Sequence, residues 1–76
     1  MLNMSKADKM FEELGYRKMV PSYWVAEYYN DSNDSVIQFN ANTQEVRLGH
    51  TDYDISIFNK EILLAIHEKM KELGWS

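Results

Sequence analysis

The spacing of the apolar residues changes twice along this chain, and this change limits the fold more than any other feature of the sequence. Apolar residues first recur at helical spacing, then alternate with polar ones, and return to helical spacing near the end. Helical spacing gives a helix one apolar stripe, whereas alternation gives a strand one apolar face. The sequence therefore predicts a helix, a set of strands and a second helix, in that order.

The first predicted helix covers roughly residues 5–14. At 100° per residue, its apolar side chains fall in one stripe about 120° wide, made of Met4, Ala7, Met10, Phe11 and Leu14. Ser5 is the expected N-cap, because Ser-x-x-Asp suits a hydroxyl group that accepts a hydrogen bond from a free backbone N–H. Asn3 is the alternative cap. Asp8 is expected on the polar side of the helix.

The last predicted helix covers about residues 60–73, with Asn59 as its N-cap and a hydrophobic contact between Phe58 and Leu63. The residues that share its apolar face, with Leu63 and Ala65 beside them, are Ile62, Ile66, Met70 and Leu73. Leu64 points to the opposite side and is the one apolar residue of this helix without an expected core position. It is either an ordinary exposed leucine or a contact point for a partner.

Both predicted helices end in the same pattern, Glu-Leu-Gly followed by an aromatic residue, at positions 13–16 and 72–75. A glycine at this place takes the left-handed conformation that closes a helix in a Schellman motif. In that motif Tyr16 should contact Phe11. We interpret the repeat as two helices with the same favourable ending rather than as an internal duplication.

The central segment contains runs of strand-forming residues separated by short polar turns. Three strands are predicted, at residues 23–29, 36–40 and 45–48, the last ended by Gly49. A fourth is expected at 53–57, and residues 16–20 are expected to be extended before Pro21. Short turns between such runs indicate antiparallel hairpins.

The alternation within the strands predicts which side chains face the helices. One apolar sheet face covered by two helices makes a complete two-layer domain. We therefore expect a single α+β domain over residues 1–76, of order α-β-β-β(-β)-α, with an antiparallel sheet and both helices on one of its faces. Glu27 should face water, which places Ala26 and Tyr28 inside. The expected core consists of Phe11, Leu14, Trp24, Ile37, Phe39, Val46, Ile62 and Ile66.

The residues that could perform chemistry form no recognisable catalytic or metal site. The chain has no cysteine, and its three glycines form no phosphate-binding loop. The His-x-Asp-x-Asp cluster at 50–54 matches no metal-binding spacing and is expected to be solvated. The Asn/Asp-rich turn at 30–35 lacks the glycine that a calcium loop requires at its sixth position, where Val36 stands. We expect no enzyme, no catalytic residue, no metal and no cofactor.

Charge and hydropathy limit the environment and the partners of the chain. Eight Lys and Arg against 12 Asp and Glu give a net charge of −4, which argues against a protein that binds phosphate backbones. The longest apolar run, at 62–66, is too short to cross a bilayer. The first residues contain no apolar signal segment. We therefore expect a cytoplasmic protein with no membrane contact, as a monomer or a weak homodimer.

The two terminal segments carry a resemblance to a known group of proteins. The string Ala-Asp-Lys-Met-Phe-Glu-Glu-Leu-Gly-Tyr at 7–16 and the ending at 62–75 resemble small proteins encoded in phages and prophages of low-GC Gram-positive bacteria. Most members of that group have no assigned function, and no catalytic or binding residue is carried over from them. The last helix of the group starts at a Thr- or Ser-led acidic turn, which Phe58-Asn59-Lys60-Glu61 replaces here.

The resemblance and the charge together imply a small phage or prophage protein that acts without catalysis, by contact with a host or phage protein, with antagonism of a host or defence protein as one role. The outer sheet face is the expected contact surface, because it holds more aromatic and apolar residues than solubility needs. The alternative is a single-stranded nucleic-acid-binding accessory protein that stacks bases on this tyrosine-bearing face. The candidate partner-binding residues are Tyr23, Val25, Glu27, Tyr29, Val36 and Leu64.

Overall fold

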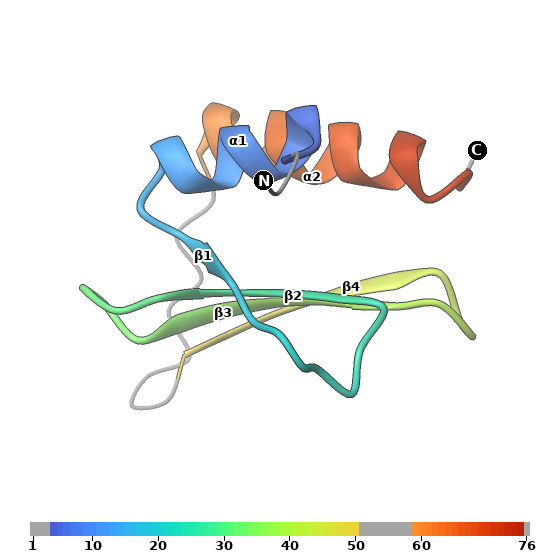
Figure 1. Cartoon of the computed structure of the whole chain (residues 1–76), viewed down its shortest axis with the longest axis horizontal. Helices are drawn as coiled ribbons and strands as arrows, with labels where there is room; N and C mark the ends of the chain where they lie inside the picture. Colours follow the sequence, from blue (N-terminus) through green and yellow to red (C-terminus); the bar gives the residue numbers. More distant parts are fainter. Residues whose placement is uncertain (1–3, 51–58, 76) are drawn as a thin grey trace.

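The computed structural model describes residues 4–50 and 59–75, which form two layers (Figure 1). The elements in chain order are α1 (Lys6–Glu13), β1 (Arg17–Lys18), β2 (Ala26–Asn30), β3 (Ser35–Asn40), β4 (Glu45–His50) and α2 (Lys60–Glu72). Both helices lie on the same side of a four-stranded antiparallel sheet, and the other side has no second layer in the described part of the chain. The predicted α+β fold is therefore confirmed.

Helix α1 begins and ends at the predicted residues. The Ser5 hydroxyl accepts a hydrogen bond of 3.1 Å from the Asp8 backbone N–H. At the other end, the Tyr16 N–H donates to the Phe11 carbonyl at 2.9 Å, and the Gly15 N–H donates to that of Glu12 at 3.0 Å. This is the Schellman pattern, and it requires the positive φ of +92° that Gly15 adopts. The Tyr16 and Phe11 rings meet edge to face.

Helix α2 follows the same rules. The Asn59 side chain accepts from the Ile62 N–H at 2.9 Å, and the Trp75 N–H closes the helix on the Met70 carbonyl at 2.9 Å, with Gly74 at φ +80°. The expected contact of Phe58 with Leu63 lies outside the described residues. Neither described helix is long and apolar enough to cross a membrane.

The sheet has the order β1-β2-β3-β4. Residue pairs such as Tyr28↔Ile37 and Ile37↔Leu48 fix its register. The fourth strand is β1, two residues of the segment expected to be extended before Pro21, whereas the strand expected at 53–57 lies outside the described residues. Gly49 does not end the third predicted strand, because β4 continues through it and pairs it with Val36.

The predicted start of the first strand was wrong, because β2 begins at Ala26 rather than at residue 23. β3 turns away after Asn40, so the segment ahead of Val25 has no strand to pair with. Trp24 is consequently half-buried and lies outside the core where it was expected.

The core lies between the sheet and the helices. Its largest fully buried side chains are Tyr28, Phe11, Phe39 and Ile37. The Phe11 and Tyr28 rings stack with centroids 4.0 Å apart, and Phe39 meets both rings edge to face. Ile62 and Ile66 of α2 are buried as expected, and Leu14 and Val46 pack against the core while partly exposed.

Candidate partner-binding surface

The six predicted partner-binding residues lie on two opposite sides of the molecule. Tyr29 and Val36 face each other across β2 and β3, and Glu27 lies one outward position further along β2, opposite Gln38. Tyr23 and Val25 belong to the segment that leads into β2, which Figure 1 shows below the sheet, away from the helices. Leu64 lies on α2, in the other layer. The structure therefore brings five of the six to the sheet side and separates Leu64 from them.

Tyr29 is already engaged by side chains of its own chain. Its hydroxyl donates to the Asp34 carboxylate, and this hydrogen bond raises the pKa of Tyr29. The Arg17 guanidinium lies over the Tyr29 ring, 5.4 Å from its centroid, and binds both carboxylate oxygens of Asp31 at 2.7 and 3.3 Å. A ring covered by a cation on one face offers less surface for stacking. Tyr29 thus belongs to a polar network with Arg17, Asp31 and Asp34.

Glu27 is also held in place. Its carboxylate accepts from the Ser22 hydroxyl at 2.7 Å and from the Gln38 amide at 2.9 Å. Ser22 in turn accepts from the Trp24 N–H at 3.1 Å. These bonds attach the segment ahead of β2 to the outer face of the sheet.

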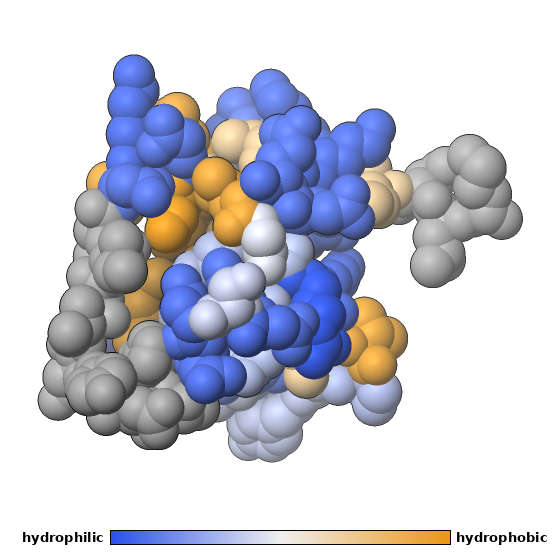
Figure 2. All heavy atoms as spheres, turned by 90° about the vertical axis from the view of Figure 1, so that its left-hand side faces the viewer, coloured by the Kyte–Doolittle hydropathy of each residue, from blue (hydrophilic) through white to orange (hydrophobic). Residues whose placement is uncertain are grey.

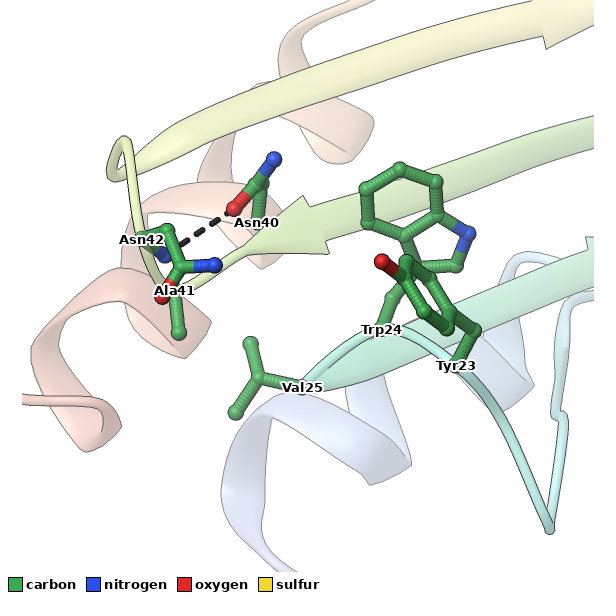
Figure 3. A pocket seen from close by; sticks show the side chains of 6 residues that line it. All are labelled: Tyr23, Trp24, Val25, Asn40, Ala41 and Asn42. Atoms are coloured by element: carbon green, nitrogen blue, oxygen red, sulfur yellow. Dashed lines mark hydrogen bonds between the residues drawn. The ribbon is translucent and has the colours of Figure 1, made fainter.

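Tyr23 and Val25 are exposed apolar residues of this side. Tyr23 is 93% exposed and Val25 is 48% exposed. Together with Trp24 they form one wall of a surface hollow of about 510 Å³, whose other wall is the β3–β4 turn at 40–42 (Figure 3). The side chains of Tyr23 and Trp24 therefore lie just before the start of β2, whereas Tyr29 lies near the other end of that strand.

Leu64 lies at a smaller groove between the two helices. With Met10 and Leu14 it makes an apolar floor, bordered by Glu13 and Glu61. Figure 2, which faces this end of the molecule, shows apolar surface between the polar surfaces of the helix layer. Leu64 was expected to be the one apolar residue of its helix outside the core, which was wrong, because Leu63 is equally exposed at 49%.

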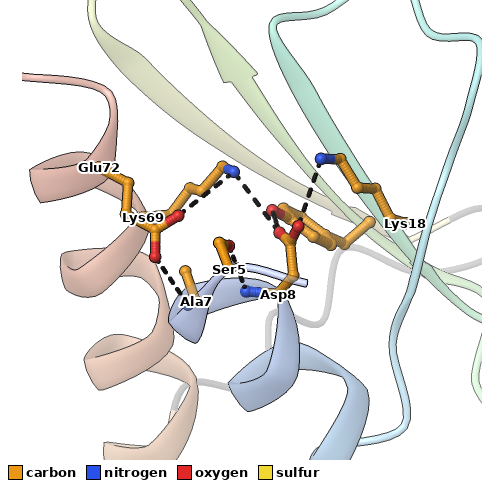
Figure 4. Close-up of polar contacts among 7 residues, drawn as sticks. Ser5, Ala7, Asp8, Lys18, Lys69 and Glu72 are labelled. Carbon is orange, nitrogen blue, oxygen red and sulfur yellow. Dashed lines mark hydrogen bonds and ion pairs between the residues drawn. The ribbon is translucent and has the colours of Figure 1, made fainter. Parts of the chain in front are cut away.

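A buried polar cluster, which the sequence analysis missed, joins the helices to the sheet (Figure 4). Asp8 was expected on the polar side of α1 but is only 8% exposed. Its carboxylate accepts from the Tyr28 hydroxyl and from the ammonium groups of Lys18 at 3.3 Å and Lys69 at 3.5 Å. Lys69 also pairs with Glu72 at 3.6 Å.

The helical spacing contains a signal for this cluster. Lys69 follows Ile62 at i+7, in a stripe that continues through Ala65 and Ile66. Asp8 follows Met4 at i+4 and precedes Phe11 by three, so it also belongs to the buried stripe. Opposite charges within the two apolar stripes indicate a buried ion pair between the helices.

The direction of each pKa shift shows the protonation state of the residues in the cluster. Burial alone would raise the pKa of Asp8, but the Tyr28 hydrogen bond and the charges of Lys69 and Lys18 outweigh burial, so that the pKa lies below its ordinary value. Burial and the bond to Asp8 raise the pKa of Tyr28. The carboxylate is therefore ionised and the phenol protonated at neutral pH, each in its ordinary form.

No described side chain of the core has a buried polar atom without a hydrogen-bond partner. Within residues 4–50 and 59–75, no three metal-ligating side chains gather in one place. The His-x-Asp-x-Asp cluster at 50–54 lies outside the described residues, except for the backbone of His50. A satisfied cluster of this kind fixes the packing of the two layers.

Comparison with known proteins gives no relative: no protein-family model, no curated protein and no solved structure matches this chain. The chemistry of its exposed surfaces is therefore the guide to its function.

Proposed function

We propose that this chain is a small, cytoplasmic, non-enzymatic protein of the phage or prophage type, which acts by binding a host or phage protein. The binding surface is the outer side of the sheet, centred on the exposed aromatic segment Tyr23–Val25. The observation that carries the proposal is the 93% exposure of Tyr23 beside Trp24 and a hollow.

An exposed tyrosine next to a tryptophan is a costly arrangement for a protein that binds nothing, because their apolar ring surface stays in water. The same two residue types are strongly enriched among the anchors of protein interfaces. The bonds from Trp24 through Ser22 to Glu27 hold the aromatic segment in one place before any partner arrives. Pre-ordered anchors lose less entropy on binding.

The charges near this surface favour a protein over a nucleic acid. Arg17 is paired with Asp31, and Lys18 points to Asp8 on the helix side. Glu45 is paired with Asn40, at the end of the sheet where the hollow lies. Arg47 is an exposed cation on this face, opposite Gln38, but Glu45 lies two residues before it on the same strand. With a net charge of −4 for the whole chain, phosphates would meet few free cations here.

The buried cluster supports a role without catalysis. A general acid or base needs a pKa near the working pH, whereas the pKa of Asp8 is lowered and that of Tyr28 is raised, both away from neutrality. Both groups are also covered by the two layers.

Affinity capture tests the proposal. The tagged chain is incubated with lysate of a low-GC Gram-positive host, and retained proteins are identified by mass spectrometry. A double variant, Tyr23→Ser with Tyr29→Ser, should retain the partner about tenfold less, the effect of losing roughly 1.4 kcal/mol of binding energy. The matched control, Leu63→Ser with Leu64→Ser, changes exposed residues of the helix layer and should retain the partner fully.

Circular dichroism must show that both double variants are folded. Loss of capture in the leucine variant alone would move the surface to the helix layer. Salt-sensitive retention of single-stranded DNA, with no protein retained, would replace the proposal by nucleic-acid binding.

A further inference from the structure

A narrow groove lies between the two helices, at the end of their layer where α1 stops and α2 starts (Figure 2). The helices run antiparallel, because the Ala7 N–H at the start of α1 donates to Glu72 at the end of α2. The C-terminal end of one helix and the N-terminal end of the other therefore flank the groove, and their partial charges have opposite signs. Side chains rather than helix ends decide the charge of this groove. The residues that line it are Met10, Glu13, Leu14, Glu61 and Leu64.

The floor of the groove is apolar and has room for one side chain. It consists of Met10 and Leu14, which are partly buried, and of Leu64, which is 49% exposed. The volume of about 130 Å³ lies well below the 300–1,000 Å³ that is typical of small-molecule sites. An exposed apolar floor of this width is stabilised when methylene groups cover it.

The rim of the groove is acidic. Glu13 and Glu61 are both exposed, and neither forms an ion pair with a described residue. Lys9 precedes Glu13 by one turn and Lys60 precedes Glu61 directly, but neither lysine lines the groove. A cation in the groove is therefore attracted by a carboxylate from each helix.

An apolar stem that ends in a cation is the structure of a long basic side chain. Arginine suits the groove better than lysine, because its planar guanidinium has five N–H donors, enough for two carboxylates, and is less strongly hydrated than an ammonium group. We propose that this groove binds an arginine side chain of a partner protein. The methylene groups lie on the floor, and the guanidinium pairs with Glu13 and Glu61. This binding site lies in the helix layer, opposite the surface of the proposed function, and goes beyond that function.

Other occupants are less favourable. Both carboxylates would repel the phosphates of a nucleic acid or of an anionic membrane. A second copy of the chain has two arginines to offer, of which Arg17 is paired with Asp31. Arg47 is exposed on the outer face of the sheet, so its contact with the groove of another copy would be head-to-tail and would not close a two-fold dimer.

The test is a titration of the ¹⁵N-labelled full chain with a blocked Arg-Ala-Arg peptide, followed by NMR. We expect saturable shifts of the Leu14 and Leu64 amide signals. The Trp24 indole signal belongs to the opposite layer and should stay unchanged, as an internal control. A Lys-Ala-Lys peptide should bind more weakly, because an ammonium group lacks the planar fork of donors. A Gln-Ala-Gln peptide should cause no saturable shift, because its side chains carry no charge.

Matched variants separate the groove from the overall charge of the chain. Glu13→Gln and Glu61→Gln should each weaken binding of the Arg-Ala-Arg peptide about two- to fivefold, the effect of losing one exposed ion pair. Glu12→Gln removes the same charge from an exposed position of α1 outside the groove and should leave the affinity unchanged. Leu64→Ser should weaken binding, whereas Leu63→Ser, at an equally exposed position outside the groove, should not. Circular dichroism must show that all five variants are folded.

The inference is wrong if the Arg-Ala-Arg peptide gives no saturable shift at Leu64, if the lysine or glutamine peptide binds as tightly, or if Glu12→Gln weakens binding as much as Glu61→Gln. Shifts at Leu64 that appear when the chain alone is concentrated would assign the groove to a second copy instead. The capture experiment separates the two proposals. A partner captured through Tyr23 without any arginine binding at the groove overturns this inference and leaves the proposed function standing. Arginine binding at the groove without any captured protein supports this inference and contradicts the proposed function.

Discussion

The Tyr28 hydroxyl in β2 donates a hydrogen bond to Asp8 in α1 inside the core, and the Tyr28 ring stacks on Phe11 of the same helix. One side chain thus joins the two layers twice, by a polar and by an apolar contact. The bond also holds Asp8 where Lys69 can reach it from α2. The stability of the fold should therefore be sensitive to this carboxylate.

Asp8→Ala should destabilise the protein by about 3 kcal/mol, because it leaves the buried ammonium group of Lys69 without its carboxylate partner across the helix interface. Urea unfolding followed by circular dichroism measures the loss. Asp31→Ala is the matched control, since it removes an exposed ion pair with Arg17 and should leave the unfolding midpoint nearly unchanged. Equal losses in the two variants would show that the cluster does not stabilise the fold.

Stability should fall on acidification below about pH 4.5. The pKa of Asp8 lies below its ordinary 3.8 and that of Glu72 below its ordinary 4.5, since hydrogen bonds and nearby lysines outweigh burial in both. A lowered folded-state pKa stabilises the fold above the unfolded-state pKa, and this contribution is lost as the pH falls through the folded-state value. Urea midpoints between pH 2 and 7 measure the loss. Asp8→Asn should reduce the fall of the urea midpoint between pH 7 and pH 2, whereas Glu12→Gln on the exposed side of α1 should not. An unchanged fall in Asp8→Asn would contradict the assignment of this acid sensitivity to Asp8.

Phe39→Ala should cost roughly 3–5 kcal/mol, because Phe39 is fully buried and contacts the rings of Phe11 and Tyr28. The free energy of unfolding of a small domain is only about 5–15 kcal/mol in total, so the variant should melt at a much lower temperature than wild type. Val36→Ala lies on the same strand but on the outer face and should melt much closer to wild type. A melting temperature that Phe39→Ala leaves unchanged would exclude Phe39 from the core.

Gly15→Ala should destabilise by about 1 kcal/mol through the backbone alone, because an L-residue is strained at φ +92°. Space is available, since an added Cβ would lie 3.4 Å from the Asn30 side chain. Gly74→Ala tests the same strain where no atom lies within 4 Å, and thermal melts of the two variants should show similar losses. A neutral Gly15→Ala would mean that α1 does not depend on its Schellman ending.

The helices and their ends could be predicted from the sequence because their causes are local. A cap such as Ser5 and a closing residue such as Gly15 act within one turn of the chain. The side chains of β3 that face the helices could also be predicted, because the alternation of apolar and polar residues decides which side they take. The buried pair of Asp8 and Lys69 was missed, because charged residues were assigned to the solvated face by their type, although the spacing places both within the apolar stripes.

The candidate site was harder to read than the fold. Strand propensity favoured Tyr23–Val25 as part of a strand, but pairing needs a neighbour, and β3 ends too early to provide one. The result is an aromatic segment beside a turn rather than a row across the sheet. The engagement of Tyr29 depends on Arg17, its cross-strand partner in β1, and on Asp34 in the turn after β2, and the alternation within one strand indicates neither contact.

The contacts of the helix layer also set the moment at which this protein can fold. Glu72 accepts a hydrogen bond of 2.9 Å from the Ala7 N–H, across 65 positions of the chain, and Lys69 meets Asp8 across 61. While the chain is being synthesised, the hairpins of the sheet can pair early, but Asp8 waits for a partner that is synthesised 61 residues later. Native packing is therefore completed only after residue 72 has left the exit tunnel, and until then α1 alone covers the apolar sheet face.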